Sequence, residues 1–276
     1  MPAASNGELK DTTPDSGLPR EAGGKTATLL SAFFGLDNGL FRVANLICPG
    51  AAGRDGMPVI FSSEIDHTTM QAGDFEVTTA AGKTGQMHCV SLLPATDAGE
   101  LRTVLLIGEF GDAKGDPPAQ VKIIGNLHAI DRARNFRGAS IGVVPLEAGP
   151  ELVMAEPVSN TAVDKGLGNW RTRGSSCPAE GVRQAIRVAW AGGVSLKSGD
   201  EPGDAERQLY RVKVRDSAGV DRDIIPVALA DANDPDNNHV LCLDTADPVV
   251  SVAFPAGILQ DPNGDLNPQT SVPLTR

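Results

Sequence analysis

The chain has 276 residues, a formal net charge of -11 and an aromatic content of 4%. A negative charge of this size excludes the positive surface that binding to nucleic-acid phosphates requires. The 31 glycines and 20 prolines interrupt the chain too often for long helices, so they indicate short strands joined by turns. The glycine-rich patterns that hold nucleotide phosphates do not occur, and no nucleotide cofactor is expected.

The first 24 residues are rich in proline, glycine, serine and charged side chains. Because such a segment offers little apolar surface to bury, it is predicted to be a disordered, flexible arm. The apolar run that follows is short and is preceded by polar residues, so no signal peptide is predicted. An apolar run of about 18 residues or more is missing, and the sequence predicts a protein that does not span a membrane.

The next feature is an internal repetition. Cys48 lies thirteen residues before Phe61, and Cys177 lies thirteen residues before Trp190. In each copy an alternating strand that begins with an aromatic residue comes next, over 75–79 and 210–214. Self-similarity of this kind indicates a tandem repeat of one structural unit. The proline- and glycine-rich stretch 145–150 is the expected boundary, which gives domains over 25–145 and 146–276.

Strand patterns fill both predicted domains. Residues 57–78 alternate as a strand, a polar turn with a short helical tendency, and a second strand. Further β-branched or alternating runs predict strands over 102–108, 120–125, 139–144, 151–156 and 249–254. We therefore expect an all-β protein with two β-sandwich domains.

Residues 45–108 carry a family resemblance. The positions that match are Phe61-Ser62, Ile65-Asp66, Thr69, Phe75 and Val77. In this pattern the segment resembles the bacterial immunoglobulin-like (Ig-like) domains of the S-layer and adhesin type. The resemblance implies two tandem Ig-like domains with a binding or structural role. The second copy has Trp190-Ala191 in place of Phe61-Ser62, so the second domain is expected to be divergent.

The four cysteines divide equally between the two predicted domains. The duplication favours disulfides between Cys48 and Cys89 and between Cys177 and Cys242, among three possible pairings. In the aligned copies, Cys242 matches the strand around 104–106 and not Cys89. Disulfides predict a secreted or periplasmic protein, whereas buried free thiols and a zinc site of cysteines and histidines are the alternatives.

Two acidic loops are candidates for calcium binding, because calcium prefers several oxygen ligands. Oxygen-bearing side chains occur at every second position in one loop, namely Asp261, Asn263, Asp265 and Asn267. The other loop, over 231–238, adds Asp234 and Asp236. The alternative is that these residues serve only the backbone angles of turns.

The functional prediction is an acidic extracytoplasmic module that binds a protein or carbohydrate surface, and it favours a role other than catalysis. The alternative is an enzyme of hydrolase, lyase or cyclase type with a small molecule in an interdomain cleft. Its acid-base candidates are Glu64, Asp66 and His67, which share one turn, together with His239. A solvated turn is the competing interpretation of the first three.

Overall fold

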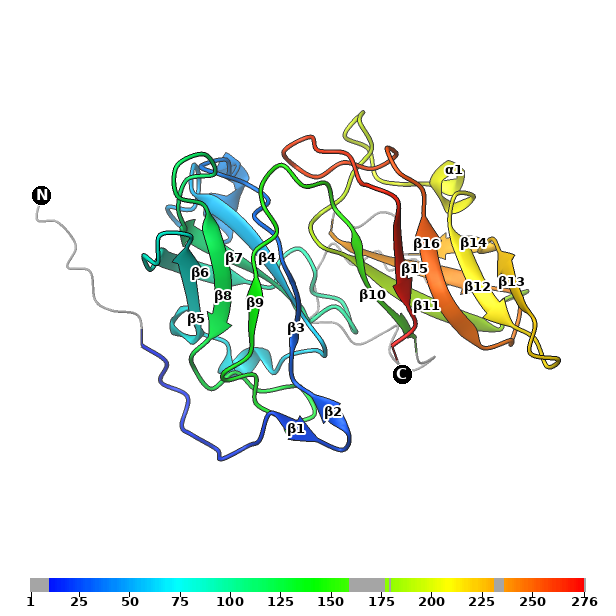
Figure 1. Cartoon of the computed structure of the whole chain (residues 1–276), viewed down its shortest axis with the longest axis horizontal. Coiled ribbons are helices and arrows are strands. Elements are labelled where there is room, and N and C mark those ends of the chain that lie inside the picture. Colours follow the sequence, from blue (N-terminus) through cyan, green and yellow to red (C-terminus); the bar gives the residue numbers. More distant parts are fainter. Residues whose placement is uncertain (1–9, 159–176, 179, 231–235, 276) are drawn as a thin grey trace, which may run out of the picture. The chain divides into compact units, whose positions relative to one another are not determined.

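The computed structural model describes residues 10–158, 177–178, 180–230 and 236–275 (Figure 1). The described chain is all-β with antiparallel sheets, and it divides into two compact units. Unit 1 contains Met1–Ser91 and Arg102–Pro145, and unit 2 contains Leu92–Leu101 and Leu146–Arg276. The segment Leu92–Leu101 interrupts unit 1 in the sequence but packs with unit 2, which the sequence did not predict.

Unit 1 is a sandwich of two sheets. One has the strand order β3-β4-β7-β6 and the other β5-β8-β9. The strands are β3 (Leu29–Ala32), β4 (Asp55–Phe61), β5 (Phe75–Thr79), β6 (Gln86–Ser91), β7 (Thr103–Glu109), β8 (Pro118–Ile123) and β9 (Ser140–Gly142). The ring of Phe61 at the end of β4 lies edge-on to Phe75 of β5 and to Phe136, with ring centroids 6.3 and 4.8 Å apart. The two sheets therefore share a core.

Unit 2 repeats this order of pairing. Its sheets are β10-β11-β15-β14 and β13-β12-β16-β17. The strands are β10 (Leu152–Pro157), β11 (Gln184–Trp190), β12 (Arg211–Arg215), β13 (Asp221–Ile224), β14 (Ala228–Ala230), β15 (Asn238–Leu243), β16 (Val249–Phe254) and β17 (Thr270–Pro273), with one helical turn, α1 (Asp204–Arg207). Trp190 of β11 packs edge-on against Phe254 of β16, across the two sheets. Phe61 and Trp190 thus end corresponding strands, as the thirteen-residue spacing indicated.

Both predicted disulfides are present, between Cys48 and Cys89 and between Cys177 and Cys242. Cys89 lies on β6, whereas Cys242 lies on β15, the counterpart of β7. The second bond therefore ends on a different strand from the first, as the aligned copies indicated. Cys48 packs with Ile107 of β7 in a small apolar cluster that also contains Ala44 and Ala51. Because neighbouring strand residues face opposite ways, and Leu106 lies in the fully buried interior, this cluster covers the outer face of the sheet.

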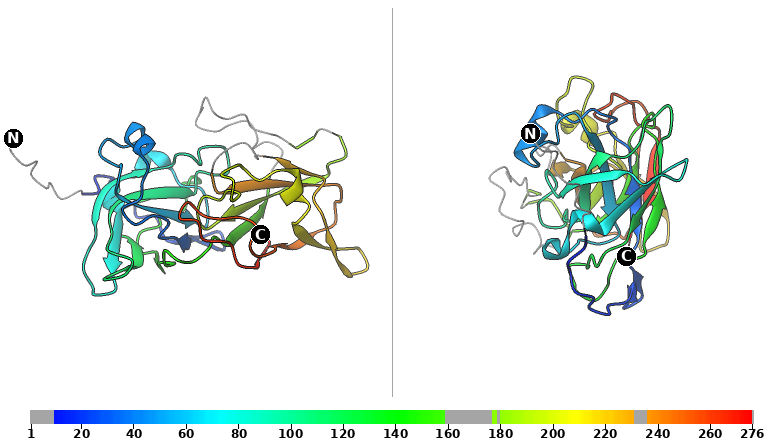
Figure 2. Two further views of the ribbon diagram at one scale, coloured as in Figure 1. Left: turned by 90° about the horizontal axis from the view of Figure 1, so that it is seen from above. Right: turned by 90° about the vertical axis from the view of Figure 1, so that its left-hand side faces the viewer.

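The prediction of a disordered arm over residues 1–24 is wrong for residues 10–24. Residues 21–26 form the hairpin of β1 (Glu21–Ala22) and β2 (Lys25–Thr26), which protrudes from unit 1 (Figure 1 and Figure 2). Ahead of this hairpin, Asp11, Thr12 and Thr13 hydrogen-bond to side chains far along the sequence. The prediction of disorder was based on the low apolar content of this segment. Residues 10–24 are instead ordered by polar contacts.

The segment Leu92–Leu101 packs on β11 through a buried charge. Arg187 of β11 donates from Nη1 to the carbonyl oxygen of Ala98 at 2.6 Å, and its Nη2 lies 3.7 Å from Oε1 of the fully buried Glu100. Arg187 lies on the face of β11 opposite the core residues Ile186 and Val188. The outer face of this sheet is therefore covered by chain from between β6 and β7.

Candidate functional site

The acid-base candidates of unit 1 are held by structural interactions. Asp66 begins a short 3-10 helix, η2 (His67–Thr69), and its Oδ1 accepts from the N–H and the hydroxyl of Thr68. Its Oδ2 accepts from Nε of Arg132 at 2.9 Å. Burial alone would raise the pKa of Asp66, but the hydrogen bonds from Thr68 and the charge of Arg132 outweigh it and lower the pKa. Asp66 is therefore a capping carboxylate.

Glu64 and His67 flank this cap. Glu64 is half-buried and His67 is exposed. The turn predicted from these three residues exists, and it has the properties of a capped surface turn.

His239 belongs instead to the interior of unit 2. Its Nδ1 lies 2.7 Å from the hydroxyl of Tyr210, and Nε1 of Trp190 donates to both groups at 3.3 Å. Because Tyr210 and Trp190 both supply hydrogens, Nδ1 is the acceptor and the imidazole hydrogen is on Nε2. Burial lowers the pKa of His239 to about 4, so the ring is neutral at pH 7. This histidine satisfies a buried polar cluster of unit 2, whereas Glu64, Asp66 and His67 belong to unit 1.

The loop after β16 uses two of its four predicted calcium ligands for its own backbone. Asn267 is buried: its Oδ1 accepts from the N–H of Ile258 and Leu259, and its Nδ2 donates to the carbonyls of Pro255 and Pro268. Asp261 Oδ1 accepts from the N–H of Asn263 and Asp265. Asn267 is thus a structural bridge between the two sides of this loop.

One oxygen in this loop has no partner. Oδ2 of Asp261 is buried without a hydrogen bond, while Nδ2 of Asn263 donates to Oδ2 of Asp265 at 2.6 Å. Burial raises the pKa of Asp261 to about 6; the backbone N–H of Asp265 offsets part of this shift, and the charge of Asp265 adds to it. Asp261, Asn263 and Asp265 are the members of the predicted set that retain oxygen atoms for a cation.

The second predicted acidic loop, over 231–238, offers fewer candidate calcium ligands than the loop after β16. Asp234 lies outside the described residues. Asp236 is buried, and its Oδ1 accepts from the N–H of Asn238 at 2.6 Å, which makes it a turn residue at the start of β15. Within the described ranges, no group of three or more histidine, cysteine, aspartate or glutamate side chains is arranged to hold a metal ion.

The three most exposed large apolar side chains in the described part of unit 1, Phe41, Val43 and Leu46, lie in one segment that the sequence analysis did not single out. Residues 41–47, between β3 and β4, contain a short 3-10 helix, η1 (Arg42–Leu46). We call the four apolar residues of this segment that are more than one-third exposed the apolar loop: Phe41 (61%), Val43 (59%), Leu46 (86%) and Ile47 (39%). In sequence they resemble core residues, and only the packing of Ala44 and Cys48 against β7 turns them outward.

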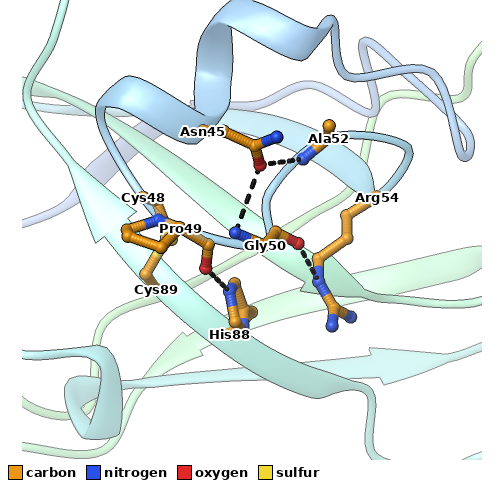
Figure 3. The surroundings of a disulfide bond; sticks show 8 residues. All are labelled: Asn45, Cys48, Pro49, Gly50, Ala52, Arg54, His88 and Cys89. Atoms are coloured by element: carbon orange, nitrogen blue, oxygen red, sulfur yellow. Dashed lines mark hydrogen bonds between the residues drawn. A yellow bond between two sulfur atoms is a disulfide. The ribbon is translucent and has the colours of Figure 1, made fainter.

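The apolar loop is attached to a rigid base (Figure 3). The Cys48–Cys89 disulfide anchors it to β6, and the ring Nε2 of His88 lies 2.9 Å from the carbonyl oxygen of Pro49. Oδ1 of Asn45 accepts from the N–H of Gly50 and Ala52, which closes the turn that follows. The exposed apolar side chains therefore project from a fixed backbone.

Comparison with protein-family models and with curated proteins finds no match to this chain. Among the described residues, no helix combines the length and the apolar character needed to cross a bilayer.

Proposed function

We propose that this protein is an extracytoplasmic binding module made of two Ig-like domains, and that it binds another protein through the apolar loop. The observation that carries this proposal is the exposure of Phe41, Val43, Leu46 and Ile47 on a disulfide-anchored segment. Grouped exposed apolar residues are typical of interaction surfaces. A rigid backbone lowers the entropy that binding costs. Three of the four side chains of the apolar loop are aliphatic, and aliphatic side chains suit a protein surface better than a carbohydrate, which requires polar partners and aromatic platforms.

The order of strands supports the Ig-like part of the proposal. Constant-type immunoglobulin domains have the sheets A-B-E-D and C-F-G. With β3 as strand A, unit 1 has this order in β3-β4-β7-β6 and β5-β8-β9. Unit 2 has it in β10-β11-β15-β14 and β12-β16-β17, with β13 as an added edge strand. The disulfides differ from the B–F bond of antibody domains, because each joins the segment between the first two strands to its own sheet.

The two disulfides support a location outside the cytoplasm. Such bonds persist in oxidising compartments and are rare where thiols are kept reduced. The described cysteines are all paired. A secreted or periplasmic protein with a fixed apolar loop is the kind of molecule that recognises a partner at or near a cell surface.

The binding proposal is tested by site-specific photo-crosslinking in the cells that produce the protein. A photoreactive amino acid is placed at Val43 or Leu46 and, as a matched control, at Val220, which is as exposed as Val43, at 59%. We expect discrete cross-linked products from positions 43 and 46 that are missing from position 220. The cross-linked partner, once purified, should bind Leu46→Asp at least about tenfold more weakly than wild type.

Because Leu46 is 86% exposed, Leu46→Asp should melt at the wild-type temperature, which separates loss of binding from loss of folding. Equal cross-linking from positions 46 and 220, or a partner that binds Leu46→Asp as tightly as wild type, would contradict the assignment of the apolar loop.

Calcium is proposed as a stabiliser of unit 2 through Asp261, Asn263 and Asp265. The support for this proposal is the buried Oδ2 of Asp261, which accepts no hydrogen bond. Burial also raises the pKa of the Asp261 carboxyl group. An ionised carboxylate in that position costs stability, and a cation would offset this cost. Two carboxylates and one amide provide only part of the six to eight oxygens that calcium takes, so water or backbone oxygens would complete the shell.

Thermal melts at pH 7.5 with EDTA or with millimolar calcium test this proposal. Calcium at about 100 times its dissociation constant should add about 2.7 kcal/mol and raise the melting temperature of wild type by several degrees. Asp261→Asn keeps the acceptor for the backbone N–H groups of Asn263 and Asp265. It should be at least as stable as wild type in EDTA and show no rise with calcium. An equal rise in both proteins would contradict a site at Asp261.

A further inference from the structure

The segment of residues 10–19, which we call the strap, is held on unit 1 by polar contacts. Oε1 of Gln71 accepts from the N–H and the hydroxyl of Thr12, and its Nε2 donates to the hydroxyl of Thr13 at 2.7 Å. Nδ2 of Asn126 donates to the carbonyl of Thr13 at 3.1 Å. Gln71 precedes β5 and Asn126 follows β8, so the strap lies across two loops at one end of this sheet.

The far end of the strap is attached in the same way. The hydroxyl of Ser16 lies 2.9 Å from Nε2 of His128, and the N–H of Asn135 donates to the carbonyl of Pro19 at 2.9 Å. Apart from the half-buried Leu18, the strap places no large apolar side chain on unit 1. Its attachment therefore depends on hydrogen bonds and charge, which are sensitive to protonation.

Two carboxyl groups meet under the strap. The Asp11 carboxylate accepts from the N–H of Thr13 and Asn126, both at 2.7 Å, and from the side chains of Gln71 and Asn126 at 3.2 and 3.3 Å. Asp74 is fully buried at the end of η3 (Ala72–Asp74), and its Oδ2 accepts from the N–H of Gln71. Both carboxyl-bearing residues crowd Gly125, where an added Cβ would lie 3.0 Å from Cβ of Asp11.

The remaining oxygen of Asp74, Oδ1, is buried without a donor and faces the Asp11 side chain. Because donors of Thr13, Gln71 and Asn126 already point at its oxygens, Asp11 is the ionised member of the pair. A proton on Asp74 Oδ1 would supply the missing donor and complete a carboxyl–carboxylate hydrogen bond. If both neighbouring carboxylates were ionised, with Asp74 buried, their negative charges would repel each other.

We propose that the strap is a proton-dependent latch, closed on unit 1 while Asp74 is protonated and shares its proton with Asp11, and released when Asp74 ionises. Release would uncover the polar surface formed by Gln71, Asn126 and His128. The proposal stands apart from the apolar loop, which lies between β3 and β4.

The direction of the pH dependence follows from the two states of Asp74. In the closed state burial raises its pKa to about 7, and the charge of Asp11 adds to this shift. In the open state the pKa returns toward 3.8. The closed state therefore binds the proton more strongly, so opening increases as the pH rises from about 4 to about 7 and levels off above it. For Asp11, burial alone would raise the pKa, but hydrogen bonds from Asn126 and Thr13 outweigh it and lower the pKa below 3.8. Protonation of Asp11 therefore changes the opening of the strap only below about pH 3.8.

Three further sets of titratable groups near the strap and η3 have partners other than Asp74. Asp15 of the strap forms an exposed ion pair with Arg137 at 3.7 Å. Nε2 of His128 lies beside the neutral hydroxyl of Ser16. On β6, which packs against η3, His88 hydrogen-bonds to the carbonyl of Pro49. Asp11 is the charged group in contact with Asp74.

Hydrogen exchange read by mass spectrometry tests the latch on the full chain. After correction for intrinsic exchange, the opening of a peptide that covers the strap should increase by more than about tenfold between pH 5 and pH 7 and stay level to pH 8.5. Asp74→Asn presents a neutral amide whose N–H groups can donate to Asp11, so its strap should stay closed at every pH. Asp15→Asn is the matched control and should keep the wild-type pH response.

Three results would overturn the proposal. The first is equal opening of the strap at pH 5 and pH 7, and the second is a wild-type pH response in Asp74→Asn. The third is an increase in exchange of the β7 amides that parallels exchange of the strap, because the whole unit would then be opening. If Asp74→Asn does not fold, the carboxyl carbon of Asp74 in wild type is titrated by NMR. A midpoint near pH 7 supports the latch, and a midpoint near 4 overturns it.

Discussion

Several polar residues that the sequence offers as functional candidates are buried and have structural partners. His239 was an acid-base candidate of the alternative enzyme hypothesis, and Asn267 was a predicted calcium ligand. Each is buried with partners that use its hydrogen-bonding groups. The sequence shows that such residues are present, but it does not show which partners they meet. Leaving a buried polar group without a partner costs more folding free energy than a hydrogen bond contributes. The hydrogen-bonding groups of these two residues are therefore used to stabilise the fold.

Acidification should destabilise unit 2 through His239. The folded pKa of about 4 lies below the unfolded value of 6.5, so the unfolded state binds the proton more strongly. The stability contributed by the neutral ring is present above pH 6.5 and is lost as the pH falls toward 4, by on the order of 3 kcal/mol.

Urea unfolding at pH 7 and pH 4.5, followed by tryptophan fluorescence, measures this effect. The loss of stability between the two pH values should be smaller in His239→Gln than in wild type, whereas the exposed control His67→Gln should behave as wild type. The same loss in His239→Gln and wild type would show that other groups cause the acid sensitivity.

At the scale of elements, alternation and spacing predicted the strands, while segments held by distant polar contacts could not be predicted. Strand β5 alternates in burial along its five residues, as its sequence pattern indicates. The segment Leu92–Leu101 carries no such period, and its position depends on Arg187, which is 86 residues away from Leu101 in the sequence. The order of the strap likewise depends on Asn126. Local patterns contain no information on such pairs.

Arg187 should be essential for the packing of Leu92–Leu101. Arg187→Met removes the donor to Ala98 and the charge beside the buried Glu100, and it should destabilise unit 2 by about 3 kcal/mol, because it breaks a buried ion pair. The control is Arg183→Met, at an exposed position just before β11, with an expected change below about 0.5 kcal/mol. Chemical denaturation measures both, and equal effects would contradict the buried role of Arg187.

The disulfide of unit 1 should stabilise the base of the apolar loop. It closes a loop with a sequence separation of 41, which corresponds to about 4 kcal/mol in the chain-entropy account. The double variant Cys48→Ala and Cys89→Ala should lower the melting temperature of unit 1 and increase amide exchange in residues 41–47. The matched variant Cys177→Ala and Cys242→Ala should leave exchange in residues 41–47 unchanged. If neither double variant affects the loop, the disulfide does not hold it.

At the scale of the whole molecule, the units are not contiguous in the sequence. The fragment Leu146–Arg276 lacks Leu92–Leu101, which belongs to unit 2. We therefore expect this fragment to melt below the corresponding transition of the full chain, because Arg187 loses its buried partners. Both tryptophans, Trp170 and Trp190, lie within it, so their fluorescence follows unit 2 in both proteins. Equal melting temperatures would show that Leu92–Leu101 contributes no stability.

The account as a whole requires a disulfide-bonded protein in an oxidising compartment, since one bond anchors the apolar loop to β6 and the other joins Cys177 to β15. The most direct measurement is the intact mass of protein isolated from its own cells, after alkylation in denaturant without reductant. We predict no alkylated cysteine before reduction and four afterwards, with Cys48 linked to Cys89 and Cys177 to Cys242 in the peptide map. Four free thiols in the unreduced protein would contradict the extracytoplasmic module proposed for this chain.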